Sequence, residues 1–185
     1  KGSSQIAFGP QTAAGAINLI STTIPENSRA TFNMVMGSFG SNKIHTTVGG
    51  SKETPKGTFG YLVEYLQLGS DGFKILDNGA STGFDKSDRL IKLRYSTPAS
   101  AKTFQSITLK VSDVEEVSNE TYLGLSADDF ILSPLRRYSA SSEDVMTSRQ
   151  TQVVVSHKIE PSKSLEFSTD FYRTTFDRNW YKLDR

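Results

Sequence analysis

The eight residues FGYLVEYL, Phe59–Leu66, place an aromatic or branched side chain at every second position. Successive side chains of a β-strand point to opposite faces, so a period of two is the signature of a strand. One face of this strand would hold Phe59, Tyr61, Val63 and Tyr65. The opposite face would hold Leu62, Glu64 and Leu66. The stretch therefore predicts a β-strand with one strongly aromatic face.

The same period of two recurs in six further stretches of the chain. They cover residues 30–37, 43–50, 91–95, 107–112, 152–157 and 165–171. We expect seven strands of about nine to thirteen residues each, whereas strands of soluble proteins usually have about five to six. Strands of about ten residues are the length that a tilted membrane β-barrel requires. The pattern predicts an all-β fold built from antiparallel strands.

The expected connections differ in length at the two ends of such a sheet. Short turns with proline fall at residues 51–57, 96–104 and 160–163, the last around Pro161. The other end would carry a tight turn at 38–42 and long connections at 69–89 and 114–146. Outer-membrane barrels show this asymmetry, with short periplasmic turns and long extracellular loops. A soluble sandwich can show it by accident.

Composition excludes several classes of protein. The 185 residues have a formal charge of +1, which gives no bulk field for nucleic acid, and we expect no nucleic-acid partner. Hydrophobic residues make up 36%, below the usual range of about 45–50%. No run approaches the roughly 18 apolar residues of a membrane helix, a test that does not detect β-barrels. The chain has no cysteine, so thiolate metal sites and cysteine nucleophiles are excluded.

No motif supports catalysis. The small-residue segment 9–15 lacks the Gly-Lys-Ser/Thr of a phosphate loop, and no G-x-S-x-G elbow is present. His45 and His157 fall in separate strands without a second ligand at metal-binding spacing, so we interpret both as ordinary strand residues. We expect neither an enzyme nor a metal site nor a bound cofactor.

The long connection at residues 114–146 holds the candidate binding residues. Ser126 followed by Asp129 fits a capping box, which predicts a short helical turn over 127–132. Arg136 and Arg137 place two guanidinium groups in this connection, where they can bind the carboxylates of an anionic ligand. The alternative is a salt bridge to Asp128, Asp129 or Glu143 that only orders the loop.

The residues FGPQTAAGAINLISTTIP, which end at Pro25, resemble the end of the plug domain of TonB-dependent outer-membrane receptors. Residues 60–88, the long connection, and FYRTTFDRNWYKLD near the end are similar to the ferric citrate receptor branch of that family. The resemblance implies a section, about seven strands, of a 22-stranded transmembrane β-barrel in the bacterial outer membrane. Residues 1–25 would be the C-terminal end of the plug and residues 26–185 the N-terminal part of the barrel.

The family resemblance also implies a function. It implies energy-coupled uptake of a ferric chelate, such as ferric citrate or a siderophore, with the inner-membrane TonB complex and outer-membrane lipid as partners. By their place in the loops, Arg136, Arg137 and Tyr122 are the expected ligand contacts. Two alternatives stay open, a passive porin-like pore and a soluble β-rich binding module.

The two ends of the chain suggest a piece of a longer protein. The sequence begins at Lys1 within a run of polar residues, and it ends at Arg185 directly after a stretch with the pattern of a strand. Seven strands cannot close a barrel of this width, and lipid does not tolerate unpaired strand edges. We therefore expect that these residues alone neither insert stably into a membrane nor transport.

Overall fold

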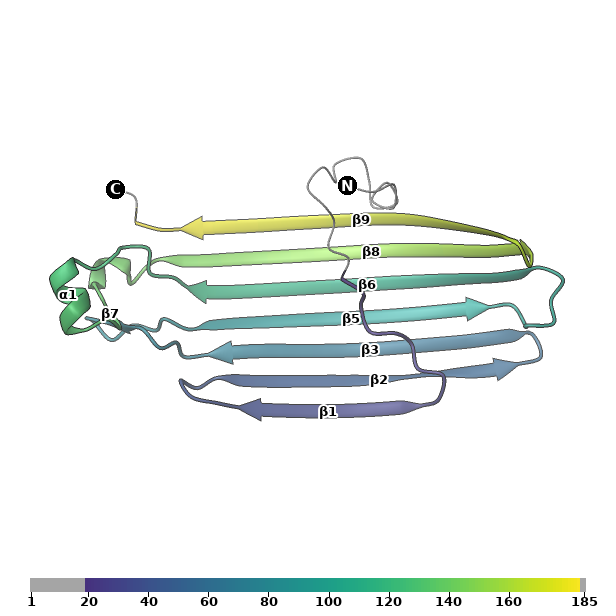
Figure 1. Ribbon diagram of the computed structural model, residues 1–185, viewed down its shortest axis with the longest axis horizontal. Helices are drawn as coiled ribbons and strands as arrows, with labels where there is room; N and C mark the ends of the chain where they lie inside the picture. The colour runs from purple at the N-terminus through teal and green to yellow at the C-terminus, as the bar shows by residue number, and fades with distance from the viewer. Residues whose placement is uncertain (1–18, 184–185) are drawn as a thin grey trace.

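The computed structural model, which describes residues 19–183, is dominated by one seven-stranded antiparallel sheet (Figure 1). The strands lie side by side in their order along the chain, so each neighbouring pair is joined directly. They are β1 (Arg29–Met36), β2 (Asn42–Thr54), β3 (Gly57–Ser70), β5 (Phe84–Ser96), β6 (Phe104–Asn119), β8 (Val145–Ser162) and β9 (Leu165–Tyr181). The prediction of an all-β antiparallel fold with these seven strands is confirmed. Within the described residues the sheet is open, because β1 and β9 each pair with a single strand.

The long and short connections segregate as expected. The connections over residues 71–83 and 120–144 lie at the end of the sheet that carries α1 (Ala127–Leu132) and the short strands β4 (Ile75–Leu76) and β7 (Arg136–Arg137) (Figure 1). A 3-10 helix, η2 (Ser139–Ser141), belongs to the same region. The opposite end has connections of two to seven residues, at 55–56, 97–103 and 163–164.

Four strands, β3, β6, β8 and β9, are longer than the expected nine to thirteen residues, β1 is shorter, and the last turn lies elsewhere than expected. β6 continues to Asn119 and β8 to Ser162, with 16 and 18 residues. The last turn therefore does not centre on Pro161, which lies inside β8, but on Lys163 and Ser164. The pairing of β8 with β9 shifts register between Ile159 and Ser162. Proline has no N–H for the ladder, so a bulge of this kind accommodates Pro161 within the strand.

One face of the sheet carries a band of apolar side chains that crosses six strands. Its members alternate along each strand and stand opposite one another in the pairing register. They are Val48, Phe59, Tyr61, Val63, Ile91, Leu93, Tyr95, Ile107, Leu109, Val111, Val153, Val155, Ile159, Phe167 and Phe171. Most of these side chains are exposed. We call this set the apolar band.

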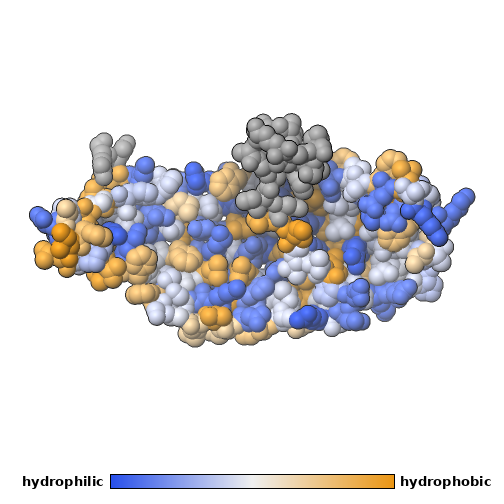
Figure 2. Space-filling model, viewed as in Figure 1, coloured by the Kyte–Doolittle hydropathy of each residue, from blue (hydrophilic) through white to orange (hydrophobic). Residues whose placement is uncertain are grey.

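The opposite face is polar and is partly covered by the chain's own N-terminal segment. Residues 19–28 cross this face from the middle of the sheet towards β1 (Figure 1). Hydrophilic and hydrophobic residues are interspersed on this face, and hydrophobic residues gather at the end that carries α1 (Figure 2). Among the described residues, the buried hydrophobic side chains are Leu62, Leu76 and Leu90. The expected plug segment, residues 1–25, lies mostly outside the described residues.

No helix within residues 19–183 is both long enough and apolar enough to cross a membrane.

Candidate functional site

The two long connections are joined into one unit by a pair of short parallel strands. The N–H of Ile75 donates to the carbonyl oxygen of Leu135 at 2.8 Å, and the N–H of Asp77 donates to that of Arg137 at 3.0 Å. These bonds tie the connection between β3 and β5 to the connection between β6 and β8. Two segments that are far apart in the sequence therefore form one surface at this end of the sheet.

Arg136 is held by carboxylates from both connections. Its Nε and Nη2 atoms donate to the two carboxylate oxygens of Asp77, at 2.7 and 3.1 Å, and its Nη1 donates to Oδ1 of Asp129 at 2.8 Å. The hydrogen bond from Arg136 lowers the pKa of Asp77 below its ordinary value. The guanidinium also lies 5.3 Å from the ring centre of Tyr138. We call Asp77, Asp129 and Arg136 the loop clasp.

The helical turn beside the clasp is confirmed, with the expected cap. The N–H of Asp129 donates to Oγ of Ser126 at 3.1 Å, and that hydroxyl in turn donates to Oδ2 of Asp129 at 3.0 Å. The hydroxyl of Tyr138 donates to the same oxygen at 2.5 Å. These bonds, from Tyr138 first and Ser126 second, lower the pKa of Asp129. The cap therefore fixes the carboxylate that Arg136 binds.

Arg137, the second predicted ligand residue, lies at a hollow next to the clasp. Its Nη1 atom donates to the carbonyl oxygen of Pro134 at 2.9 Å, and no carboxylate is paired with it in the part of the chain that is described. The hollow measures about 460 Å³. It is lined by Lys74, Arg137, Tyr122, Phe130 and the chain over residues 121–127. The fold thus brings Arg137 and Tyr122 together at one hollow, and Arg136 does not line it.

Lys74 and Asp77 were missed by the sequence interpretation. Lys74 donates from Nζ to Oγ1 of Thr121 at 2.8 Å, a contact that spans 47 residues. Asp77 lies 59 residues from Arg136. No local spacing marks either residue, because both contacts depend on how two separate connections meet. The pairing of Arg136 with Asp129, which the sequence offers as the alternative to a ligand contact, is present. Arg136 also binds Asp77, which the sequence does not predict.

Tyr122 is anchored from two sides. Its ring packs edge-on against Trp180 of β9, with ring centres 5.1 Å apart, and the ammonium of Lys182 lies 5.5 Å from its centre. Its N–H donates to Oδ2 of Asp144 at 3.0 Å, and the N–H of Leu183 donates to the other oxygen at 2.7 Å. Burial acts to raise the pKa of Asp144, but these hydrogen bonds outweigh it, and the pKa lies below its ordinary value.

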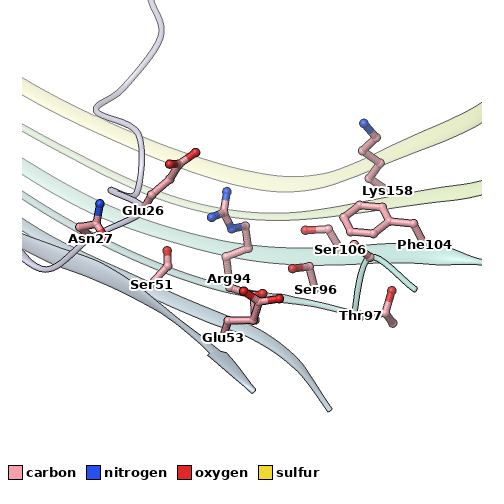
Figure 3. Close-up of a pocket in the computed structure, with 12 residues that line it drawn as sticks. Glu26, Asn27, Ser51, Glu53, Arg94, Ser96, Thr97, Phe104, Ser106 and Lys158 are labelled. Carbon is pink, nitrogen blue, oxygen red and sulfur yellow. The ribbon is translucent and has the colours of Figure 1, made fainter. Parts of the chain in front are cut away.

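A second, larger hollow of about 780 Å³ lies on the polar face near the short turns (Figure 3). Arg94 and Lys158 rise from the sheet beside the segment that carries Glu26 (Figure 3). Both signs of charge line it, and no arrangement of nucleophile and base is present there. Across residues 19–183, no group of three or more potential metal-ligating side chains gathers at one place.

No family model, curated protein or solved structure matches this chain.

Proposed function

We propose that these residues form part of the wall of an outer-membrane β-barrel of the TonB-dependent receptor type. In this proposal the protein imports a ferric chelate, such as ferric citrate or a siderophore, with energy from the inner-membrane TonB complex. The observation that carries the proposal is the contrast between the two faces of the sheet. A wall between lipid and a filled lumen needs one apolar face and one polar face on the same strands.

The apolar band runs far enough along single strands to meet lipid. On β8 it extends from Val153 to Ile159. Six residue steps cover roughly 20 Å along the strand, or about 16 Å of height at a tilt of about 40°. The apolar band of outer-membrane barrels is about 25 Å tall. The band on β8 therefore covers about two thirds of that height.

Charged residues border the apolar band towards the long connections. Arg89 donates to Asp113 at 3.1 Å and to Glu115 at 3.2 Å, and Arg149 donates to the other oxygen of Asp113 at 3.0 Å. These residues stand on the same face as the band. Ionised side chains are costly in hydrocarbon, so this group would lie at or beyond the edge of the lipid tails.

A soluble module would have to cover the apolar band with a second layer, and residues 19–183 contain no such layer. A passive pore is compatible with the same wall, but the segment over the polar face favours a filled lumen. Uptake of radiolabelled ferric citrate, measured in cells with and without TonB, separates the two. Equal uptake in both would favour the passive pore.

The hollow at Lys74 and Arg137 is the site that we assign to the chelate. Both cations are free of carboxylate partners among the described residues, and the carboxylates of a citrate-type chelate accept hydrogen bonds from such groups. Arg136 is already bound to two carboxylates, so its proposed role is to hold the loops. This refines the expectation that both arginines contact the ligand.

Binding of ferric citrate to the purified full-length protein tests this site. We expect Lys74→Ala with Arg137→Ala to weaken binding by about tenfold or more, because two charge-assisted hydrogen bonds are lost. The matched control is Lys102→Ala with Lys163→Ala, which removes two exposed cations from the short turns. Unchanged binding in the first pair would place the ligand elsewhere. Loss of uptake with unchanged binding would assign these residues to a later step.

A further inference from the structure

The segment that crosses the polar face, residues 19–28, packs closely against glycine residues of the sheet. A Cβ atom on Gly60 would lie 2.9 Å from Cγ2 of Ile24, and one on Gly49 would lie 2.9 Å from Cδ of Pro25. These distances are too short for real Cβ contacts, so a side chain at Gly60 would displace Ile24. A side chain at Gly49 would meet Pro25 and also the carbonyl oxygen of Tyr61 in β3, at 2.8 Å. Leu62, which pairs with Gly49 and lies two residues from Gly60 on β3, is 1% exposed. The two glycines thus form a furrow that residues 24 and 25 fill.

Further contacts fix the segment where it leaves the face. Oγ of Ser51 donates to the carbonyl oxygen of Pro25 at 2.8 Å. At the edge of the sheet, a Cβ atom on Gly50 would lie 2.9 Å from the Cα of Ser28. Gly50 therefore lets the backbone turn closely from the face of the sheet into β1.

The start of the segment is held differently, by one lysine. Nζ of Lys92 donates to the carbonyl oxygens of Thr22 and Ser21, at 2.5 and 3.2 Å. Just before this contact, Leu19 and Ile20 are 88% and 82% exposed, whereas Ile24 is partly buried. The segment is thus held on the sheet in two ways. Hydrogen bonds from Lys92 hold it at Ser21 and Thr22, and close packing on glycine holds it from Ile24 onwards.

We propose that residues 24–28 are a fixed strap and that the chain before them pivots at Ser21–Thr23, with Lys92 as the latch. The strap is held by close packing on Gly49, Gly50 and Gly60, whereas the latch consists of two hydrogen bonds from one flexible side chain. Loss of the latch frees residues 19–22 and leaves the strap in place. In a receptor, the chain could then move on the N-terminal side of Ser21–Thr23 while residues 24–28 stay fixed on the barrel wall. That consequence rests on the proposed function, whereas the strap itself does not.

Single cysteines test the strap in the full-length protein, because these 185 residues contain none of their own. We expect Ile24→Cys to react with a maleimide about tenfold more slowly than Ile20→Cys in the folded protein. Adding Gly60→Val should raise the rate at position 24 to that at position 20. The matched control is Gly124→Val, since a Cβ atom on Gly124 meets nothing within 4 Å.

The latch is tested with Lys92→Ala and a nitroxide attached at Thr22→Cys. We expect the spin label to become mobile in Lys92→Ala, while Ile24→Cys keeps its slow reaction rate. Equal reaction rates at positions 20 and 24 without further substitutions would overturn the strap. A rise in the rate at position 24 in Lys92→Ala would show that the segment is released as one piece, which would overturn the pivot.

Discussion

Arg136 and Asp77 form a bidentate pair across 59 residues of sequence, with Nε 2.7 Å from Oδ1 and Nη2 3.1 Å from Oδ2. A planar guanidinium that meets a carboxylate in this way fixes direction as well as distance. Because Nη1 also binds Asp129, the position of one side chain depends on both long connections. The pair therefore holds the connection between β3 and β5 against the connection between β6 and β8.

Removal of the clasp should loosen both connections. We expect Arg136→Gln to broaden the distance distribution between spin labels at Asn78→Cys and Ser133→Cys, two exposed positions on the two connections. The side chain of glutamine cannot supply the fork of three donors that now meets two carboxylates. Pulsed electron spin resonance measures the distribution. Arg149→Gln is the matched control, and an unchanged distribution in Arg136→Gln would show that the β4–β7 pairing suffices.

The clasp should open in acid. Both carboxyl groups have a pKa below the ordinary 3.8 in the folded protein, so their ionised forms are the ones that the clasp stabilises. This stabilisation is fully present above pH 3.8 and is lost as the pH falls through the lower folded-state pKa values. The spin-label distribution should therefore stay narrow from neutral pH to about pH 4 and broaden below it. Broadening near neutral pH would contradict the assignment to Asp77 and Asp129.

Asp144 should be the most sensitive residue at the base of the long connection. It is 3% exposed and accepts the N–H groups of Tyr122 and Leu183. In Asp144→Ala both backbone N–H groups lose a charged acceptor, and hydrogen bonds to charged groups are worth about 1.5–3 kcal/mol each. Hydrogen exchange of these two amides should accelerate accordingly. Glu143→Ala, an exposed neighbour, is the control and should leave both amides protected.

The sequence predicts the sheet well because its signal is local. The period of two in residues 59–66 follows from the pleat, and the capping box at Ser126 lies within four residues. Strand ends were less predictable, since pairing extends β8 through Pro161 by means of a bulge. The site was predictable only in part. Arg136, Arg137 and Tyr122 share one connection, whereas Lys74 and Asp77 reach them through a contact between connections that no sequence spacing encodes.

The 185 residues alone should not form a stable membrane protein. In the described residues β1 and β9 present unpaired ladders, and a bilayer offers no water to satisfy them. We expect the isolated chain in detergent to associate through these edges, which light scattering after size exclusion would detect as mixed oligomers. A monomeric, heat-resistant closed barrel would contradict this prediction.

Two adjacent positions of β6 test which face meets lipid. Leu109 belongs to the apolar band, whereas Thr108 points to the polar face at the same height. If the band lies in hydrocarbon, Leu109→Arg should destabilise the full-length protein by about 2–4 kcal/mol, the cost of arginine near the middle of a bilayer. Thr108→Arg should cost much less, because its face is polar. Urea unfolding in lipid vesicles measures both variants. Equal costs would remove the main support for the membrane wall, and a larger cost for Thr108→Arg would reverse the assignment of the two faces.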